Sequence, residues 1–310
     1  MGTQINLTLF GDAKASQLDA SNRLVAYYEN LLTVNREGSE VMAVNDAAGD
    51  HAVSVSDATY SLTKRAIQLS RQNFGFNATI GPLVKLWKIG FTDAHVPTDS
   101  QIHDRLALID PLQADFNDAD LSIFLKRAGM ELDLGGIAKG YIADRIADYW
   151  RAYGKRAGMI DLGGNLLLVG DSPAHPDGKW RVGIQAPSSE RGKAILSVKI
   201  GPCSAVTSGI YERHLEAGGK SYHHILDPQT GYPRQNNLAG VTIFSKASID
   251  GEIETARLFF AGQPVPGWAA DRPDLYGAVF VTKDKRVTVV GLKDANVTVL
   301  DPSYQVTYTD

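Results

Sequence analysis

The stretch Glu131–Trp150, ELDLGGIAKGYIADRIADYW, decides the fold. Its first four residues, Glu131–Leu134, predict a strand, and Gly135-Gly136 predicts a tight turn, because glycine adopts backbone conformations that other residues avoid. Apolar residues then recur at helical spacing, which predicts an amphipathic helix. A helix N-terminus presents free N–H groups and a partial positive charge, so it suits a phosphate. Lys139 lies in this first turn, where the dipole disfavours a cation; a bound anion would explain it, and a solvated lysine is the alternative.

Composition limits the possible classes of protein. The chain has 310 residues, 44% of them hydrophobic, with a net charge of −4 and a single cysteine, Cys203. Such a chain has no basic excess for nucleic acid, no internal disulfide and no cysteine-based metal site. No apolar run approaches the roughly 20 residues of a membrane span, so stable membrane insertion is not expected. The N-terminus lacks a leader pattern, which favours the cytoplasm, or an extracytoplasmic location if the sequence has been trimmed.

Periodicity extends outward from the central stretch in both directions. Before it, the patterns predict a strand at 4–10, a helix at 16–33, a loop at 34–45, a strand at 52–56, a helix at 58–72, a short helix after residue 74, a helix at 102–109 and a strand near 121–126. After it come strands on either side of Gly163-Gly164, further strands, a helix at 250–261 and two last strands. Strands and helices mix without regular βαβ alternation, which predicts an α+β fold in one large mixed domain over 1–310.

Four clusters place polar residues beside glycine: 131–144, DLGGN at 161–165, TSGIYER with YHHILDPQTGYP at 207–233, and DGEIET at 250–255. In the third cluster, His223 and His224 are adjacent, so on a strand they face opposite ways and one of them enters a given pocket. Asp227 precedes a turn that carries Thr230 and would support the histidine. A lone histidine is more often structural, but an acid and hydroxyls close by favour a functional role here.

The fourth cluster has two acids at the start of a helix. Asp250 and Glu252 suit a cap and a first-turn acid, which is stabilising without any ligand. Carboxylate oxygens at a helix start also suit Mg²⁺, which uses few protein ligands and keeps waters or phosphates. Both interpretations stay open on the residues alone.

At these clusters the chain resembles the ApbE family of FAD:protein FMN transferases. The match spans nearly the whole length, and LGGIAKGY and YHHILDPQTGYP are its most specific strings. The resemblance implies a T-fold-like architecture of two intimate halves with the FAD site between them. It implies that FMN passes from FAD to a threonine hydroxyl of a target flavoprotein, that AMP leaves, and that Mg²⁺ is used. A lysine and a metal would stabilise charge on the diphosphate, and a histidine would take the threonine proton.

The resemblance also implies roles for residues. Catalytic roles fall to Lys139 at the diphosphate, His224 as the site histidine and Asp227 as its supporting acid. The metal would take Glu252 and the Ala138 carbonyl, with Thr255 as a weaker partner and Asp250 as a second candidate that more naturally caps the helix. The residues expected to bind the FAD substrate are Asn35, Ser39, Glu131, Asp133, Gly136, Lys139, Asp144, Gly164, Thr207, Ser208, Gly209, Arg213, His224 and Thr230.

Two departures from the family pattern keep other functions open. The metal-binding helix usually reads Asp-Ala-Leu-Ser-Thr, whereas here Glu252, Thr255 and Ala256 stand in register with the Asp, Ser and Thr. Many family transferases have a tyrosine at the place of Asn35; asparagine cannot stack on a flavin and would admit water. A Mg²⁺-dependent FAD pyrophosphatase that gives FMN and AMP, and a carrier that binds FAD without turnover, are therefore the alternatives. The sequence does not name the target or the oligomeric state.

Overall fold

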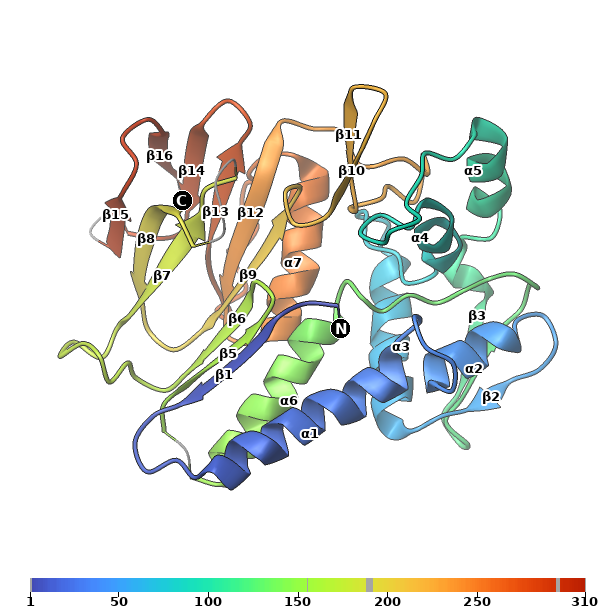
Figure 1. Cartoon of the computed structure of the whole chain (residues 1–310), viewed down its shortest axis with the longest axis horizontal. Coiled ribbons are helices and arrows are strands. Elements are labelled where there is room, and N and C mark those ends of the chain that lie inside the picture. The colour runs from blue at the N-terminus through green and yellow to red at the C-terminus, as the bar shows by residue number, and fades with distance from the viewer. Residues whose placement is uncertain (1, 155, 188–191, 294–295, 310) are drawn as a thin grey trace. The chain divides into compact units, whose positions relative to one another are not determined.

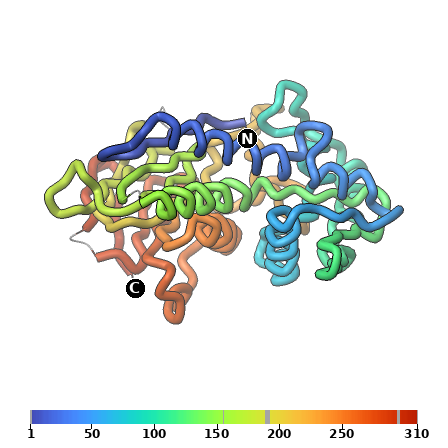
Figure 2. Tube along the Cα trace, turned by 90° about the horizontal axis from the view of Figure 1, so that it is seen from below, coloured from blue at the N-terminus to red at the C-terminus, as the bar shows by residue number. Residues whose placement is uncertain are grey.

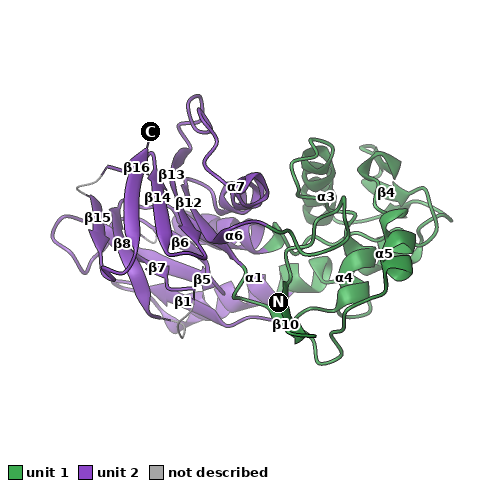
Figure 3. Cartoon of the chain, turned by 90° about the horizontal axis from the view of Figure 1, so that it is seen from above, with its two compact units in different colours: residues 1, 27–138, 210–235 green, residues 2–26, 139–209, 236–310 purple. Residues whose placement is uncertain are grey.

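The computed structural model describes residues 2–154, 156–187, 192–293 and 296–309, and it is an α+β fold, as predicted (Figure 1). The described residues form two compact units, coloured separately in Figure 3. Unit 1 comprises Tyr27–Ala138 and Ile210–Gln235, and unit 2 comprises Gly2–Ala26, Lys139–Gly209 and Asn236–Asp310. The chain therefore enters each unit more than once. The FAD site between two halves stays a prediction.

Unit 2 is built on a sheet that has eight strands within the described residues (Figure 1). Neighbours pair antiparallel, except for the parallel pair of β14 and β16. In spatial order the strands are β1 (Ile5–Leu9), β5 (Gly158–Leu162), β6 (Asn165–Val169), β9 (Ser204–Gly209), β12 (Leu238–Ser245), β13 (Leu275–Thr282), β14 (Arg286–Val290) and β16 (Gln305–Thr309).

Both faces of this sheet are covered. On one face lies a smaller sheet of β15 (Val297–Val299), β8 (Ala194–Ile200) and β7 (Trp180–Gln185), and side chains of both sheets share an apolar core that includes Phe244 and Leu196. The helix α7 (Ser248–Ala261) packs on β6, β9 and β12. All eight residues of β12 are buried, as expected for a strand covered on both sides.

The predicted central helix is present as α6 (Ala138–Ala152), all but its first residue in unit 2. Its Trp150 is fully buried and donates a hydrogen bond from Nε1 to Ser21 Oγ (2.8 Å) on α1 (Ala15–Leu32). Figure 2 shows α6 in green beside α7 in orange. In the part of the chain that the structure describes, no helix is both long and apolar enough to cross a bilayer.

Unit 1 has more residues in helices than in strands. Its core gathers around Trp87, with Leu83, Ile102 and Leu226. Its elements are α2 (Glu40–Asp46), β2 (Val53–Ser54), α3 (Asp57–Ser70), α4 (Gly81–Trp87), α5 (Asp99–Leu106), the 3₁₀ helix η1 (Pro111–Gln113), β3 (Ala114–Asn117), β4 (Ser122–Leu125), β10 (His214–Ala217) and β11 (Lys220–His223). Ser56 caps α3.

Two local predictions were wrong, each for a reason that the hydrogen bonds show. Residues 34–45 are not all loop, because Ser39 caps α2 by accepting a hydrogen bond from Met42 N (2.9 Å). Glu131–Leu134 is extended but pairs with no strand among the described residues. Instead, the side-chain amide of Asn45 bonds both the N–H (2.7 Å) and the carbonyl (3.0 Å) of Leu132. A buried side chain thus takes the place of a ladder partner.

Candidate functional site

The first turns of α6 and α7 cross at Gly140. A Cβ at this position would lie 2.7 Å from both the Ile249 Cα and the Ser248 carbonyl oxygen, so only glycine permits the approach. The crossing sets Lys139 of α6 against the start of α7. In the central stretch, Gly140 therefore allows the close packing, and the preceding Lys139 brings a cation to the same place.

Asp144 of α6 caps α7. Its two carboxylate oxygens accept hydrogen bonds from Ser248 N (2.8 Å) and Ile249 N (3.0 Å), while the N-cap residue Ala247 makes no side-chain bond. Burial raises the pKa of Asp144, and the two backbone hydrogen bonds act in the opposite direction. Asp250 does not cap the helix as expected, because it lies inside the first turn and the capping position is served by Asp144.

Glu252 is the buried acid of this crossing, with 4% of its surface exposed. Its Oε1 accepts a hydrogen bond from Asn165 Nδ2 (2.9 Å) and lies 3.4 Å from Lys139 Nζ. Its Oε2 is buried and has no hydrogen-bond partner among the described residues. Buried polar atoms are rarely left unpaired, so this oxygen fits a hard cation that would bind it.

The residues around Glu252 limit how a cation would be held. Thr255 is buried, and its hydroxyl donates to the Glu252 carbonyl oxygen (2.9 Å). Among the described residues, no three His, Cys, Asp or Glu side chains gather as a metal cage. A cation here would rely on one carboxylate together with carbonyl, phosphate or water oxygens, which is the usual manner of Mg²⁺.

The DLGGN motif forms the turn between β5 and β6. Gly163 and Gly164 both have positive φ, 68° and 89°, and Gly164 N donates to Asp161 Oδ1 (3.0 Å). This turn starts β6 at Asn165, whose side chain reaches Glu252. On β9, the Thr207 hydroxyl bonds the Thr242 hydroxyl (2.8 Å), and Ser208 and Gly209 end the strand.

The two adjacent histidines of unit 1, His223 and His224, differ in their partners. His223 is buried; its Nε2 lies 3.0 Å from the Arg234 carbonyl oxygen, and its Nδ1 accepts from Ile225 N (3.3 Å). His224 is half-buried, and its Nδ1 lies 3.2 Å from the Arg213 carbonyl oxygen. A carbonyl oxygen can only accept, so this contact makes Nδ1 the donor and Nε2 the basic nitrogen of a neutral ring.

Asp227 holds the turn that follows the histidines. Its carboxylate accepts from Gln229 N (2.9 Å) and from the Arg234 guanidinium (3.0 Å), and it is buried. Gly231 closes the turn, and its carbonyl oxygen accepts from the indole of Trp87 (2.8 Å). The support of His224 by Asp227 stays a prediction; the His224 ring contacts the Arg213 carbonyl through its Nδ1.

Charged residues of unit 1 gather where the central stretch meets α4. Glu131 forms an ion pair with Lys85 (2.8 Å), and Gly135 N donates to Asp133 Oδ1 (2.7 Å). Burial raises the pKa of Asp133, while the Gly135 hydrogen bond and the charges of Arg213 and Lys85 oppose the rise.

The other predicted residues of unit 1 have local contacts. Gly136 lies against the ring of Phe76, which a Cβ would approach to 3.1 Å. Asn35 is exposed, Ser39 is buried as the cap of α2, and the exposed Thr230 accepts from Tyr232 N (3.3 Å).

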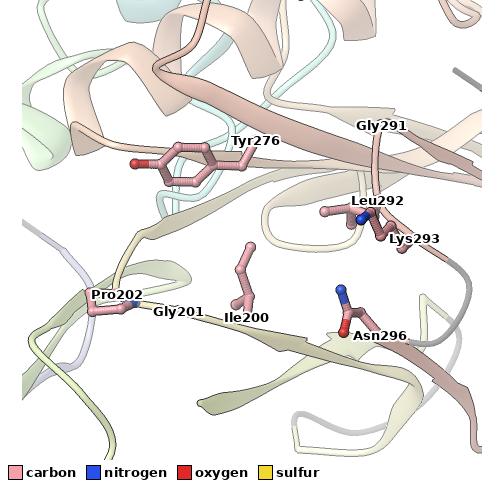
Figure 4. A pocket seen from close by; sticks show the side chains of 8 residues that line it. All are labelled: Ile200, Gly201, Pro202, Tyr276, Gly291, Leu292, Lys293 and Asn296. Carbon is pink, nitrogen blue, oxygen red and sulfur yellow. The ribbon is translucent and has the colours of Figure 1, made fainter. Parts of the chain in front are cut away.

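The sequence did not single out Asn165 or Ser248, although Asn165 stands in one of the polar clusters. The structure also contains a pocket on unit 2 of about 450 Å³, lined by Ile200, Tyr276, Leu292 and Asn296 among others (Figure 4). Burial raises the pKa of Tyr276 there. None of the residues predicted to form the site lines this pocket.

Comparisons with known proteins agree on one family. The model of the ApbE family matches residues 1–280. The chain is similar to FAD:protein FMN transferase of Klebsiella pneumoniae, with 42% identity over 99% of this chain and 94% of that protein. It is also similar to FAD:protein FMN transferase of Treponema pallidum, with 34% identity over 98% and 88%. The crystal structure of an ApbE protein from Thermotoga maritima matches with a TM-score of 0.82 and 26% identity, over 92% of this chain and 93% of that one.

Proposed function

This chain belongs to the ApbE family, and from that premise we propose that it transfers FMN from FAD to a threonine hydroxyl of a target flavoprotein and releases AMP. The transferase activity is supported by the names of full-length relatives up to 42% identical. FAD is the substrate, and the acceptor is a protein. The threonine oxygen forms a bond to the phosphorus of FMN, the bond from that phosphorus to the bridging oxygen breaks, and AMP leaves.

The observation that carries the metal part of the proposal is the unpartnered Oε2 of Glu252. Mg²⁺ at this oxygen, with the Ala138 carbonyl and Thr255 as further ligands, would neutralise charge on the diphosphate when bound. Asp250 is the alternative carboxylate. The Lys139 ammonium lies beside Glu252 at the start of α6, where a diphosphate is favoured by the helix N-terminus.

His224 is proposed as the base that takes the threonine proton. Its Nδ1 is committed to the Arg213 carbonyl, which fixes the ring and leaves Nε2 as the basic nitrogen. Asp227 keeps the adjoining turn in place through Gln229 and Arg234. Two residues of the proposed site, Ser39 and Asp144, also serve as helix caps. The other proposed nucleotide contacts are Asn35, Glu131, Asp133, Gly136, Gly164, Thr207, Ser208, Gly209, Arg213 and Thr230.

A second candidate function, FAD pyrophosphatase, is favoured by the exposed, small side chain of Asn35. Incubation with FAD and Mg²⁺, with and without a flavoprotein target, separates the two. AMP release that needs the target, with flavin bound covalently to it, supports transfer. AMP together with free FMN in the absence of a target supports hydrolysis, and no AMP under either condition would contradict both.

The metal ligand is tested by two isosteric variants. Glu252→Gln keeps the shape and removes the charge, so it should raise the Mg²⁺ concentration that gives half-maximal activity. Asp250→Asn is the matched control and should leave that concentration close to wild type. A shift in Asp250→Asn alone would show that the wrong carboxylate of α7 was chosen.

A further inference from the structure

Asn165 links the start of β6 to the acid on α7. We infer that Asn165 determines which cation the site accepts, by holding Oε1 of Glu252 so that only Oε2 can coordinate. The inference rests on the proposed role of Glu252 as a metal ligand. It adds a function to a residue outside that proposed ligand set.

The direction of each hydrogen bond follows from chemistry. A carboxylate oxygen only accepts, so the Asn165 amide must turn its NH₂ toward Glu252 (2.9 Å). Its Oδ1 then faces Ser248, whose hydroxyl must donate (2.6 Å). Asn165, Ser248 and Glu252 are exposed by only 1%, 0% and 4%, so water does not compete for these bonds. The chain from Ser248 through Asn165 thus fixes the orientation of the carboxylate.

Oε1 is further occupied by the Lys139 ammonium at 3.4 Å. Oε1 thus has the Asn165 amide and the Lys139 ammonium close by, whereas Oε2 has no hydrogen-bond partner among the described residues. The carboxylate is therefore prepared to bind a metal ion through Oε2 alone. Mg²⁺ accepts few protein carboxylates in a near-octahedral shell, whereas Ca²⁺ takes six to eight oxygens and often binds a carboxylate through both. Holding Oε1 therefore penalises Ca²⁺ relative to Mg²⁺.

The test is direct metal binding to the full-length protein without FAD. Bound Mn²⁺ is followed by electron paramagnetic resonance, and Mg²⁺ and Ca²⁺ are added as competitors to obtain their dissociation constants. Asn165→Leu removes the donor at similar volume and should shift the preference toward Ca²⁺ by about tenfold, the effect of altering one charge-assisted hydrogen bond. Ser248→Ala removes the bond that orients the amide and should shift the preference in the same direction by less.

The matched control is Asn236→Leu. Asn236 also bonds α7, donating to the Phe259 carbonyl oxygen (2.7 Å), but at the other end of the helix. The Asn236→Leu variant should leave the preference for Mg²⁺ over Ca²⁺ unchanged. Circular dichroism and thermal unfolding check that each variant is folded. If Asn165→Leu does not fold, Ser248→Ala alone decides the question.

Three results would overturn the inference, and they differ. An unchanged preference in folded Asn165→Leu would mean that Oε1 is not withheld from the metal. An equal loss of affinity for Mg²⁺ and Ca²⁺ would mean that Asn165 supports the fold of the site without influencing which ion is preferred. Absence of Mn²⁺ binding by the wild-type protein and by both variants, both alone and with FAD added to supply phosphate oxygens, would contradict the metal site of the proposed function itself.

Discussion

Exchanging each histidine for the amide that preserves its structural hydrogen bond separates catalysis from folding. In His224→Asn, the amide nitrogen stands close to the place of Nδ1 and can still donate to the Arg213 carbonyl, but the basic nitrogen is lost. A positioned general base contributes about 10²–10⁴-fold in rate, which corresponds to about 2.7–5.4 kcal/mol in the activation free energy. We expect kcat for AMP release to fall by that factor, with an unchanged melting temperature.

His223→Gln is the matched variant. Its amide nitrogen can still donate to the Arg234 carbonyl, while the bond that Nδ1 accepts from Ile225 N is lost. One neutral hydrogen bond is worth about 1 kcal/mol, so the free energy of unfolding should drop by about that amount while kcat stays close to wild type. The assay measures AMP from FAD in the presence of a flavoprotein target, and urea unfolding gives stability. Equal losses of kcat in the two variants, or a larger loss in His223→Gln, would refute the assignment of His224 as the base.

Three further predictions concern α6. Lys139→Ala should weaken FAD binding, measured by fluorescence titration, by about tenfold or more because a charge-assisted contact to the diphosphate is lost; an unchanged affinity would remove Lys139 from the site. Gly140→Ala should lower the free energy of unfolding by about 1–3 kcal/mol through overpacking against Ile249. The control Gly201→Ala should not, because a Cβ there would meet nothing closer than 3.5 Å. Similar losses of stability in the two variants would show that α6 and α7 can move apart to admit the methyl group. The pKa of Asp144 is raised above its unfolded value, so its contribution to stability is fully present below about pH 4 and is lost as pH rises through the folded-state pKa. In urea unfolding from pH 4 upward, Asp144→Asn should therefore flatten the decline of the free energy of unfolding with pH. The same decline in wild type and variant would contradict this.

Elements whose signal is local could be predicted from the sequence. The spacing of apolar residues in α1 and α6 reports one buried helix face, and alternation reports the strands of unit 2. Glu131–Leu134 looked like a strand for the same reason, since an extended backbone with alternating burial has the same pattern whether its partner is a strand or a side chain. That partner, Asn45, lies 87 positions away.

The candidate site was less predictable, because its geometry depends on distant pairs. Nothing near Asn165 in the sequence indicates that its amide meets Ser248 and Glu252, 83 and 87 residues later. The cap of α7 was assigned to a nearby acid, whereas Asp144 reaches it from another helix. The edge strand β16 was missed because most of its residues are exposed and it pairs in parallel with β14.

The interleaved course of the chain has a consequence for synthesis. Translation runs from the N-terminus, so every segment of unit 1 is complete at Gln235, while unit 2 still lacks β12 and α7. Until β12 is made, β9 has an open edge, the kind of surface on which nascent chains associate wrongly. A product that ends early would carry His224 and Lys139 without Glu252. Such a fragment would lack the proposed metal ligand, and its uncovered β9 edge would make it prone to aggregate.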